Sequence, residues 1–374
     1  MKRTLSIIFA ILIVGSMFAL DFDWDGEFRS RSAMYNNVNG DPGGHTDNRF
    51  RLGFNTELHP NLNLRALLEI SHMWGDWYAP AGGNINVDAK EVYIDMMVDA
   101  IKSRARVGHQ PWADHRGLVM DDTFSGVSLM HDFSEQMNFK AAFGKYLEND
   151  PEDRHDDMQG FLFSFNHEAD FSLGADAYFT WMRIPMGAKN SMFKYVSLAP
   201  YLNMRLNPIV LDATVIFQLN DNGYDFMENK VETETAFGVA VNVSGDMEPL
   251  EWNADLFFIG ENDLFSLSNY YHNNLYLLGI GEHHDGLGLY TFATTADNYL
   301  ALTGQAKFAL TEKVKFFGAA GFVNGAGFEI NGGMEYQLIP DLMGVALYGA
   351  RAFMDEDATD KDPYAMGATL KLEF

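Results

Sequence analysis

Arginines recur at every second position in several segments, as Arg29 with Arg31, Arg49 with Arg51, and Arg104 with Arg106. Guanidinium groups stay charged at any working pH and bind carboxylates or phosphates through paired N–H donors. Because successive side chains of an extended strand point to opposite faces, both arginines of a pair lie on one face of their strand. This spacing predicts a surface that attracts anions.

The strands that carry these arginines have two unlike faces. In DFDWDGEFRSRSAMY, residues 21–35, the aromatic residues Phe22, Trp24 and Phe28 stand at even-numbered positions. The charged residues stand at odd-numbered positions and therefore on the opposite face of the strand. Segments of this kind recur to the last residue, about 18 in all. Each has about the 9–11 residues of a tilted membrane strand and exceeds the usual soluble strand.

The connections between these segments alternate in length. Short turns such as HPN, DAIKS and SEQ alternate with longer polar stretches, among them residues 36–48, 148–158 and 220–230. The pattern predicts an all-β fold, a transmembrane antiparallel up-and-down β-barrel of about 18 strands, with 16 as the alternative. A soluble sandwich or lectin-like fold is the rival, but it needs a continuous apolar interior, and here the second face repeatedly carries charges or amides.

The first twenty residues, MKRTLSIIFAILIVGSMFAL, have a basic start, an apolar stretch and a small-residue exit. This layout predicts a cleaved signal peptide over residues 1–19, followed by one barrel domain over residues 20–374. No later segment is apolar over the roughly 18 residues of a spanning helix. Cysteine is absent, which excludes disulfides and thiolate chemistry. The 52 Asp and Glu against 26 Lys and Arg argue against a nucleic-acid partner.

Tryptophans stand at the ends of the expected strands and have the parity of the apolar face. These residues are Trp24, Trp74, Trp181 and Trp252. Tryptophan is apolar with one polar handle, so it favours the two interfaces of a membrane. We therefore predict an aromatic girdle that faces lipid.

The last segment, YAMGATLKLEF, alternates to the terminal Phe374. A final strand with an aromatic carboxy-terminus, together with the leader and the even strand count, resembles Gram-negative outer-membrane porins over the whole chain. The resemblance implies an outer-membrane location, short periplasmic turns, long external loops and a barrel embedded in outer-membrane lipid. It also implies that the β-barrel assembly machinery recognises the C-terminal strand through Phe374, and it allows a homotrimer.

Parity then separates the lumenal charges into two groups. The expected basic strip consists of Arg29, Arg31, Arg49, Arg51, Arg65, Arg104, Arg106 and Lys371. The expected acidic wall consists of Glu91, Asp95, Asp176, Asp212, Glu234, Asp255, Glu329 and Glu335. The two groups would order water and favour anions along the strip. The alternative is that arginines such as Arg29 or Arg65 merely pair with Glu27, Glu57 or Glu69 and neutralise the interior.

The third external loop, QPWADHRGLVMDDTFSG at residues 110–126, is a candidate constriction. In porins this loop commonly folds inward, and here it offers Trp112, Asp114, His115, Arg116, Asp121 and Asp122. The preceding RARVGHQPW resembles a strand end of alginate-export-type 18-stranded channels, although His109 stands where that family has an arginine. A solvated external turn is the other interpretation.

Residues 260–297 form the longest connection and are too apolar for a plain solvated loop. They suit an extra hairpin, a lid or a subunit contact. His283, His284 and Asp285 adjoin there, but adjacent histidines of an extended chain point apart, so we predict no metal site. We expect no cofactor, only loose Ca²⁺ or Mg²⁺ at the acidic runs ENDPEDRHDD and MDEDATDKD.

These features predict a porin, a water-filled channel for passive diffusion of small hydrophilic solutes, biased toward anions by the basic strip. The first alternative is a substrate-specific channel for carboxylate-bearing solutes or anionic oligosaccharides. A structural barrel and an outer-membrane hydrolase are further alternatives. We expect the protein not to be an enzyme.

Overall fold

The computed structural model describes residues 22–38, 41–73, 85–147, 157–186, 189–221, 233–267, 271–284, 295–296, 298–356, 358 and 361–374. Regular structure within these ranges is β-strand, and no α-helix occurs among them. None of this part of the chain forms a helix long and apolar enough to cross a membrane. The predicted signal peptide, residues 1–19, lies outside the described residues.

The strands are long and follow one another with few interruptions. In chain order they are β1 (Phe22–Val38), β2 (Asp41–His59), β3 (Leu62–Met73), β4 (Ile85–Val98), β5 (Ser103–Ala113), β6 (Asp121–Ser134), β7 (Met137–Leu147), β8 (Met158–Glu168), β9 (Phe171–Met186), β10 (Lys189–Leu206), β11 (Ile209–Asp221), β12 (Glu234–Met247), β13 (Leu250–Ile259), β14 (Leu264–Phe265), β15 (Thr295–Ala296), β16 (Leu300–Thr311), β17 (Val314–Val323), β18 (Gly327–Ile339), β19 (Met343–Met354) and β20 (Tyr364–Glu373).

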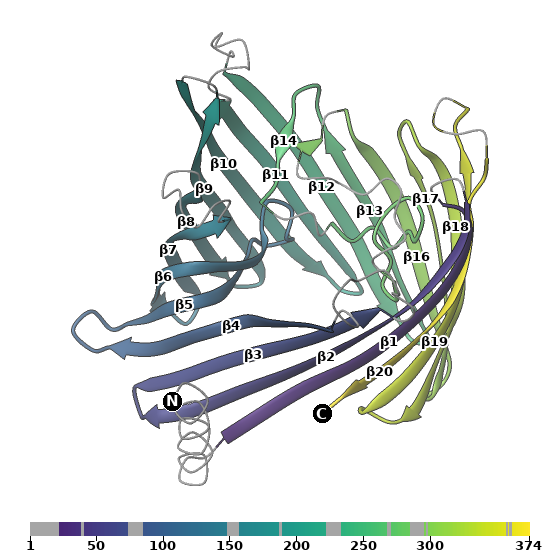
Figure 1. Cartoon of the computed structure of the whole chain (residues 1–374), viewed down its shortest axis with the longest axis horizontal. Coiled ribbons are helices and arrows are strands. Elements are labelled where there is room, and N and C mark those ends of the chain that lie inside the picture. Colours follow the sequence, from purple (N-terminus) through teal and green to yellow (C-terminus); the bar gives the residue numbers. More distant parts are fainter. Residues whose placement is uncertain are drawn as a thin grey trace, which may run out of the picture.

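Within the described residues, eighteen of these strands form one antiparallel sheet that closes on itself (Figure 1). Each strand pairs with its neighbours in the chain, β13 pairs with β16, and β20 pairs back to β1. The small hairpin β14–β15 lies outside that sheet. Closure leaves no open strand edge, which is the condition for crossing a bilayer with strands. The predicted barrel and its strand number are confirmed.

One end of the barrel carries only short turns, which we call the turn end. The strand bounds leave two residues between β2 and β3, and similarly short turns between β6 and β7 and between β10 and β11. The opposite end, the loop end, carries the longer connections, of which the one between β13 and β16 is the longest. This is the predicted alternation of short turns and long loops.

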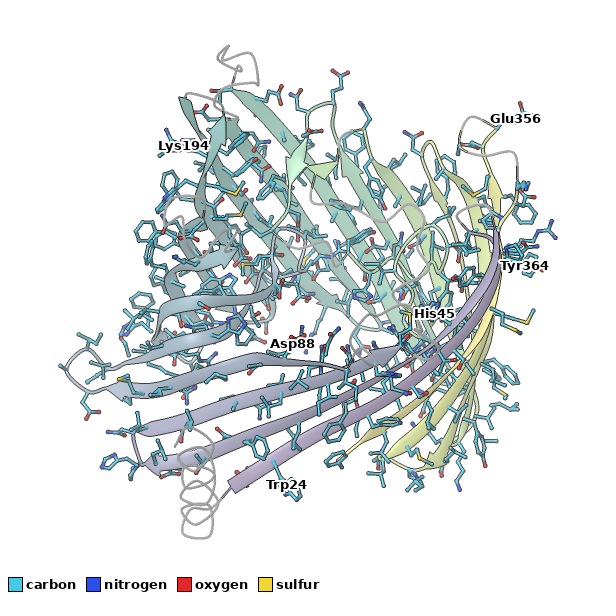
Figure 2. The ribbon with its side chains drawn as sticks, viewed as in Figure 1. Trp24, His45, Asp88, Lys194, Glu356 and Tyr364 are labelled. Carbon is cyan, nitrogen blue, oxygen red and sulfur yellow. The ribbon has the colours of Figure 1, made fainter. Side chains whose placement is uncertain are left out.

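The outer face of the barrel is apolar. Large side chains stand exposed at every second position of many strands, as with Phe161 and Phe163 on β8 or Phe328 and Ile330 on β18. Trp24 is 68% exposed and points away from the barrel (Figure 2). In water such a surface would drive aggregation, whereas in a bilayer it is solvated by lipid.

A charged residue, Arg351, lies on this apolar face between the exposed Leu347 and Phe353, and a β-bulge in β19 would be one way to place it there. The register between β19 and β20 runs without a shift from Met343 to Arg351. Arg351 is instead tolerated because it is near the loop end, where its guanidinium lies 3.7 Å from Asp362. Long cationic side chains near a membrane interface reach the polar layer in this way.

The β1–β2 hairpin is longer than expected. Residues 36–48 were predicted to be an external loop, but β1 continues to Val38 and β2 begins at Asp41. Asp41, Pro42, Gly43 and Gly44 have turn-like composition, so the sequence suggests a loop where the ladder with β1 continues.

The interior is not uniformly polar. Toward the loop end, inward apolar side chains of the wall pack with apolar loop residues into one buried cluster. Phe124, Leu162 and Ile216 supply the wall, and Leu118 and Leu277 come from the loops. The loops are therefore part of the packed core of the barrel.

Gly327, the first residue of β18, tests how tightly the short β17–β18 turn is built. Its φ is +134°, and a Cβ placed there would lie 2.1 Å from the Phe353 carbonyl oxygen. We expect Gly327→Ala to cost about 1–3 kcal/mol from backbone strain alone. Denaturant unfolding of the protein in lipid vesicles measures this loss. Gly349→Ala is the matched control, since its Cβ would meet the nearest atom at 3.8 Å and should leave stability within experimental error.

Candidate functional site

The basic strip lies on one continuous part of the wall. Antiparallel register sets Arg29 of β1 opposite Arg49 of β2 on one side and opposite Lys371 of β20 on the other. Three cations from three adjacent strands thus share one height in the lumen. Arg31 lies one step nearer the loop end, opposite Asp47.

Most cations of the strip are engaged by carboxylates. Arg31 lies 3.0 Å from Asp47, Arg49 2.6 Å from Glu27, Arg51 2.6 Å from Glu69, and Lys371 3.6 Å from Glu27. Arg65 pairs with Asp25 and lies 3.6 Å from Glu91, while Arg104 and Arg106 both lie 2.9 Å from Asp95. The strip is therefore a column of ion pairs, in which Arg65 has Asp25 and Glu91 as partners and not the acids that the neutralising alternative named.

Glu91 and Asp95, which we expected on a separate acidic wall, lie inside the basic strip. They belong to β4, which stands between β3 and β5 in the sheet. Three other acids stand apart from the strip, namely Asp176 on β9, Asp212 on β11 and Asp255 on β13. Glu329 and Glu335 are on β18, and Glu335 lines a pocket together with cations of the strip. Glu234 is the first residue of β12 and is half-buried opposite Asn220.

The connection between β5 and β6 folds into the barrel around one carboxylate. Asp114 is 6% exposed and accepts hydrogen bonds from the backbone N–H groups of four residues of its own loop. These donors are Arg116 at 3.2 Å, Leu118 at 3.0 Å, Val119 at 2.8 Å and Met120 at 2.8 Å. Because a carboxylate accepts charge-assisted bonds, it can replace the missing ladder partners of a tight loop.

The tip of this loop crosses the lumen to the acids of the opposite wall. His115 Nε2 lies 2.6 Å from Asp212 Oδ2, and the His115 ring stacks on Tyr201 at 3.9 Å. The His115 backbone N–H donates to Asp176 at 3.2 Å, and the Arg116 guanidinium pairs with Asp255. The third loop thus folds into the lumen and brings the His115 and Arg116 side chains to the acids of the opposite wall.

The other loop residues have different surroundings. Trp112 is buried edge-on against Phe124, at 6.3 Å between ring centroids. Asp121 lines a lumenal pocket of about 360 Å³ together with Arg116 and Asp212. Asp122 accepts a hydrogen bond from the N–H of Thr123 and does not line that pocket.

A second inward segment, residues 271–284, belongs to the connection between β13 and β16 and was not predicted to enter the lumen. Just before it, Ser266 donates to the Leu118 carbonyl at 2.9 Å, so the two inward loops are joined. The Tyr271 hydroxyl donates to Asp255. Burial, and secondarily the Asp255 charge, raise the pKa of Tyr271 well above its usual range, so the hydroxyl keeps its proton.

Glu329 of β18 anchors the middle of this segment. Its side chain is fully buried and accepts the N–H groups of Tyr276 at 2.7 Å and of Leu277 and Leu278 at 2.8 Å. The Tyr276 ring stacks on Tyr348 at 4.6 Å. The apolar run from residue 275 to 280 was the sequence signal for burial, but it did not indicate against which wall.

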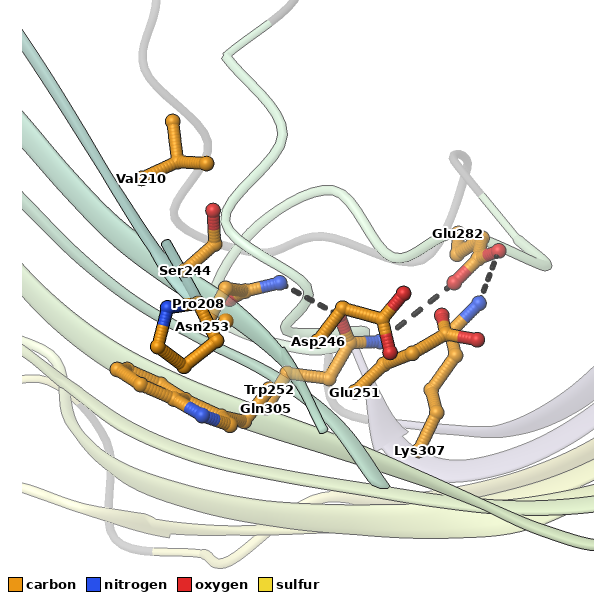
Figure 3. A pocket seen from close by; sticks show the side chains of 11 residues that line it. Pro208, Val210, Ser244, Asp246, Glu251, Trp252, Asn253, Glu282, Gln305 and Lys307 are labelled. Atoms are coloured by element: carbon orange, nitrogen blue, oxygen red, sulfur yellow. Dashed lines mark hydrogen bonds and ion pairs between the residues drawn. The ribbon is translucent and has the colours of Figure 1, made fainter. Parts of the chain in front are cut away.

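Two pockets remain on the turn side of these loops. One, of about 500 Å³, is lined by three cations of the strip, by Glu282 and His283 of the second segment, and by carboxylates of the wall. The cations are Arg29, Arg49 and Lys371, and the wall carboxylates include Glu27, Glu335 and Glu373. Another, of about 410 Å³, lies between β11 and β16. There Gln305 and Lys307 donate to Glu282 at 3.5 and 2.6 Å, and Asn253 donates to Gln305 at 3.1 Å (Figure 3).

No protein-family model and no curated protein matches the chain. Solved structures do. The outer membrane protein OpdK from Pseudomonas aeruginosa matches with a TM-score of 0.63 and 12% identity, covering 94% of this chain and 99% of its own. The chain has the fold of outer-membrane porins.

Two further neighbours of this porin fold are similarly distant in sequence. OccK2 (OpdF) of Pseudomonas aeruginosa, solved in complex with glucuronate, matches with a TM-score of 0.63, 12% identity, and 95% and 98% coverage of this chain and its own. OccAB1 of Acinetobacter baumannii gives a TM-score of 0.62, 10% identity, and 95% and 96% coverage. OpdK itself is also known in a structure with vanillate.

The interface residues of the porin barrel lie as follows. Trp24 is on the outer face of β1, and Trp181 packs on the outer aromatic residues Phe161 and Phe179. Trp252 stands near the start of β13, and Trp74 lies outside the described residues. Phe374 exchanges two backbone hydrogen bonds with Gly26, at 2.8 and 3.0 Å. The aromatic girdle and the recognition of Phe374 during assembly stay predictions.

Proposed function

We propose that the protein is an outer-membrane porin that passes small hydrophilic solutes and favours carboxylate-bearing anions. The observation that carries this proposal is the pocket where Arg29, Arg49 and Lys371 meet inside a closed barrel. Arg49 lies 2.6 Å from Glu27, and Lys371 lies 2.5 Å from Glu373 and 3.6 Å from Glu27. A guanidinium has five N–H donors, so Arg29 and Arg49 can each bind more than one carboxylate. A transient solute carboxylate can bind beside Glu27 without displacing it.

A substrate-specific channel is the second candidate. It is favoured by the two inward loops, because hydrogen-bonded loops leave polar groups fixed around a narrowed path. The neighbours solved with vanillate and with glucuronate hold carboxylates, and this supports the same class of solute here. The fold neighbours are channels and not enzymes, and we propose no catalytic activity. Homotrimer formation and loose binding of Ca²⁺ or Mg²⁺ stay predictions.

Single-channel recording in a planar bilayer under a salt gradient tests the proposal. We expect stable current steps with a reversal potential on the anion side. In Arg29→Ala/Arg49→Ala, loss of about 1 kcal/mol of attraction, the scale of one charge pair at contact distance in water, should lower the anion-to-cation permeability ratio about fivefold. Arg351→Ala is the matched control, because Arg351 is on the outer face.

Current steps without ion preference, with the same permeability ratio in the double variant, would contradict the role of the basic strip in anion preference. Absence of steps from folded protein would contradict the channel itself. Saturable block by added glucuronate would favour the substrate-specific candidate over simple diffusion.

A further inference from the structure

Two histidines and one aspartate from separate segments converge at the loop-side end of the basic strip. His45 Nε2 and His284 Nε2 lie 3.1 Å apart, and His45 Nε2 lies 3.8 Å from Asp47 Oδ2. One ligand-type atom from each of the three residues falls within 4.8 Å of the other two. We propose that His45, Asp47 and His284 bind a transition-metal ion of the Zn²⁺ type, a site that is independent of the proposed transport function.

The wall half of this site follows from strand geometry. His45 and Asp47 are two residues apart on β2, so both face the lumen. They stand opposite Ala33 and Arg31 of β1. Arg31 donates to both oxygens of Asp47, at 3.0 and 3.1 Å, which fixes the orientation of the carboxylate. Metal ligands are commonly held by such outer partners.

The loop half is placed without help from a metal. His284 ends the inward segment 271–284 and is 1% exposed. The preceding residue is fixed to the wall, since Thr369 donates to the His283 carbonyl at 2.8 Å, and Glu329 holds the segment further back. The two imidazole rings meet edge-to-face, with centroids 5.0 Å apart and planes at 72°. The two imidazoles are therefore already held side by side by contacts within the protein, before a metal ion binds.

Two of the three separations between the ligand atoms are close to those of tetrahedral coordination, and the third is within 4.8 Å. Ligands about 2.0–2.1 Å from a tetrahedral ion lie about 3.3–3.4 Å from one another. The two Nε2 atoms are slightly closer than this, and the Asp47 oxygen is slightly farther from His45. Both differences are a few tenths of an ångström, within the reach of small side-chain rotations. Two imidazoles with one carboxylate select Zn²⁺, Cu²⁺ or Ni²⁺ over Ca²⁺ and Mg²⁺, which prefer oxygen alone.

A neighbouring cluster provides a contrast within the same segment. Glu282, His283 and Glu335 also come together, but Lys307 already supplies a cation there. Its Nζ lies 2.6 Å from Glu282 and 3.3 Å from Glu335. His283 and His284 thus point apart, as expected for adjacent residues, and each joins a different cluster. His283 is the matched control for His284.

Calorimetric titration of the folded, EDTA-stripped full-length protein with ZnCl₂ tests the proposal. We expect one ion per chain, binding weakened by about 100-fold or more in His45→Gln and His284→Gln, and unchanged binding in His283→Gln. Heat-modifiable migration on gels verifies that each variant is folded. In the unaltered protein, Zn²⁺ should also raise the unfolding temperature relative to EDTA.

Three results would overturn the site. They are no saturable Zn²⁺ binding by the unaltered protein, full binding in both His45→Gln and His284→Gln, or loss of binding in His283→Gln. Should one of the two glutamine variants not fold, the other still decides by comparison with His283→Gln, and the absence of saturable Zn²⁺ binding by the unaltered protein still overturns the site.

Discussion

Replacing Glu329 by alanine should release residues 271–284 from the barrel wall and raise the single-channel conductance. The change removes the acceptor of three buried N–H groups. Each buried donor left without an acceptor costs about 1–3 kcal/mol, so the local penalty is several kcal/mol. A short segment without regular structure cannot offset this, and the donors regain partners only by moving toward water.

Single-channel recording measures the rise in conductance that release of the segment should cause. Protease cleavage near residue 280 measures whether the segment has become accessible. Glu335→Ala is the matched control, since it removes a lumenal carboxylate of the same strand that is bonded to side chains and not to the backbone. Glu329→Gln retains one acceptor oxygen and should be intermediate. Unaltered conductance and cleavage in Glu329→Ala would show that the apolar contacts alone hold the segment.

Replacing Asp114 by alanine should have the second large effect, a shift of ion preference toward cations. Asp114 accepts four backbone hydrogen bonds of its own loop, and a bond to a charged acceptor is worth about 1.5–3 kcal/mol. Without them the loop loses its shape. Arg116 and His115 then leave the acidic wall, so that Asp255 loses its cationic partner and Asp212 loses a hydrogen bond.

The reversal potential under a salt gradient measures this change, and the conductance should rise with it. Asp122→Ala is the control, because Asp122 is exposed and bonds only its neighbour Thr123 among the hydrogen bonds found for it. Asp114→Asn, which keeps one oxygen, should retain part of the wild-type preference. A reversal potential that is identical in Asp114→Ala and the unaltered protein would refute the role assigned to the loop.

The strands were predictable from sequence because each strand meets two solvents. Alternation over a segment such as residues 21–35 records lipid on one side and water on the other, and parity then gives the lumenal residues. The same logic explains Arg351, where position near the rim outweighs parity. Beyond the lipid layer this signal ends, so the outer part of the β1–β2 hairpin, with His45 and Asp47, was assigned to a loop.

The site was less predictable because its contacts join distant residues. Parity placed Arg49 and Glu27 in the lumen, but their 2.6 Å contact depends on the register between two strands. The composition of residues 260–297 indicated that they are too apolar for a solvated loop. It could not indicate that three backbone N–H groups of this loop donate to Glu329, because that contact exists only in the folded loop. The local sequence indicates on which face of the strand a residue lies, but not which distant residue it contacts.

The seam between β1 and β20 has a consequence for the time course of folding. Phe28 pairs with Leu372, so the wall is completed by a contact that spans nearly the whole chain. Joining ends separated by about 340 residues costs about 5 kcal/mol of chain entropy. Contacts of such long range form late and slowly. Until they form, β1 presents an unsatisfied edge to every other chain nearby, and the length of that interval sets how much protein is lost to aggregation.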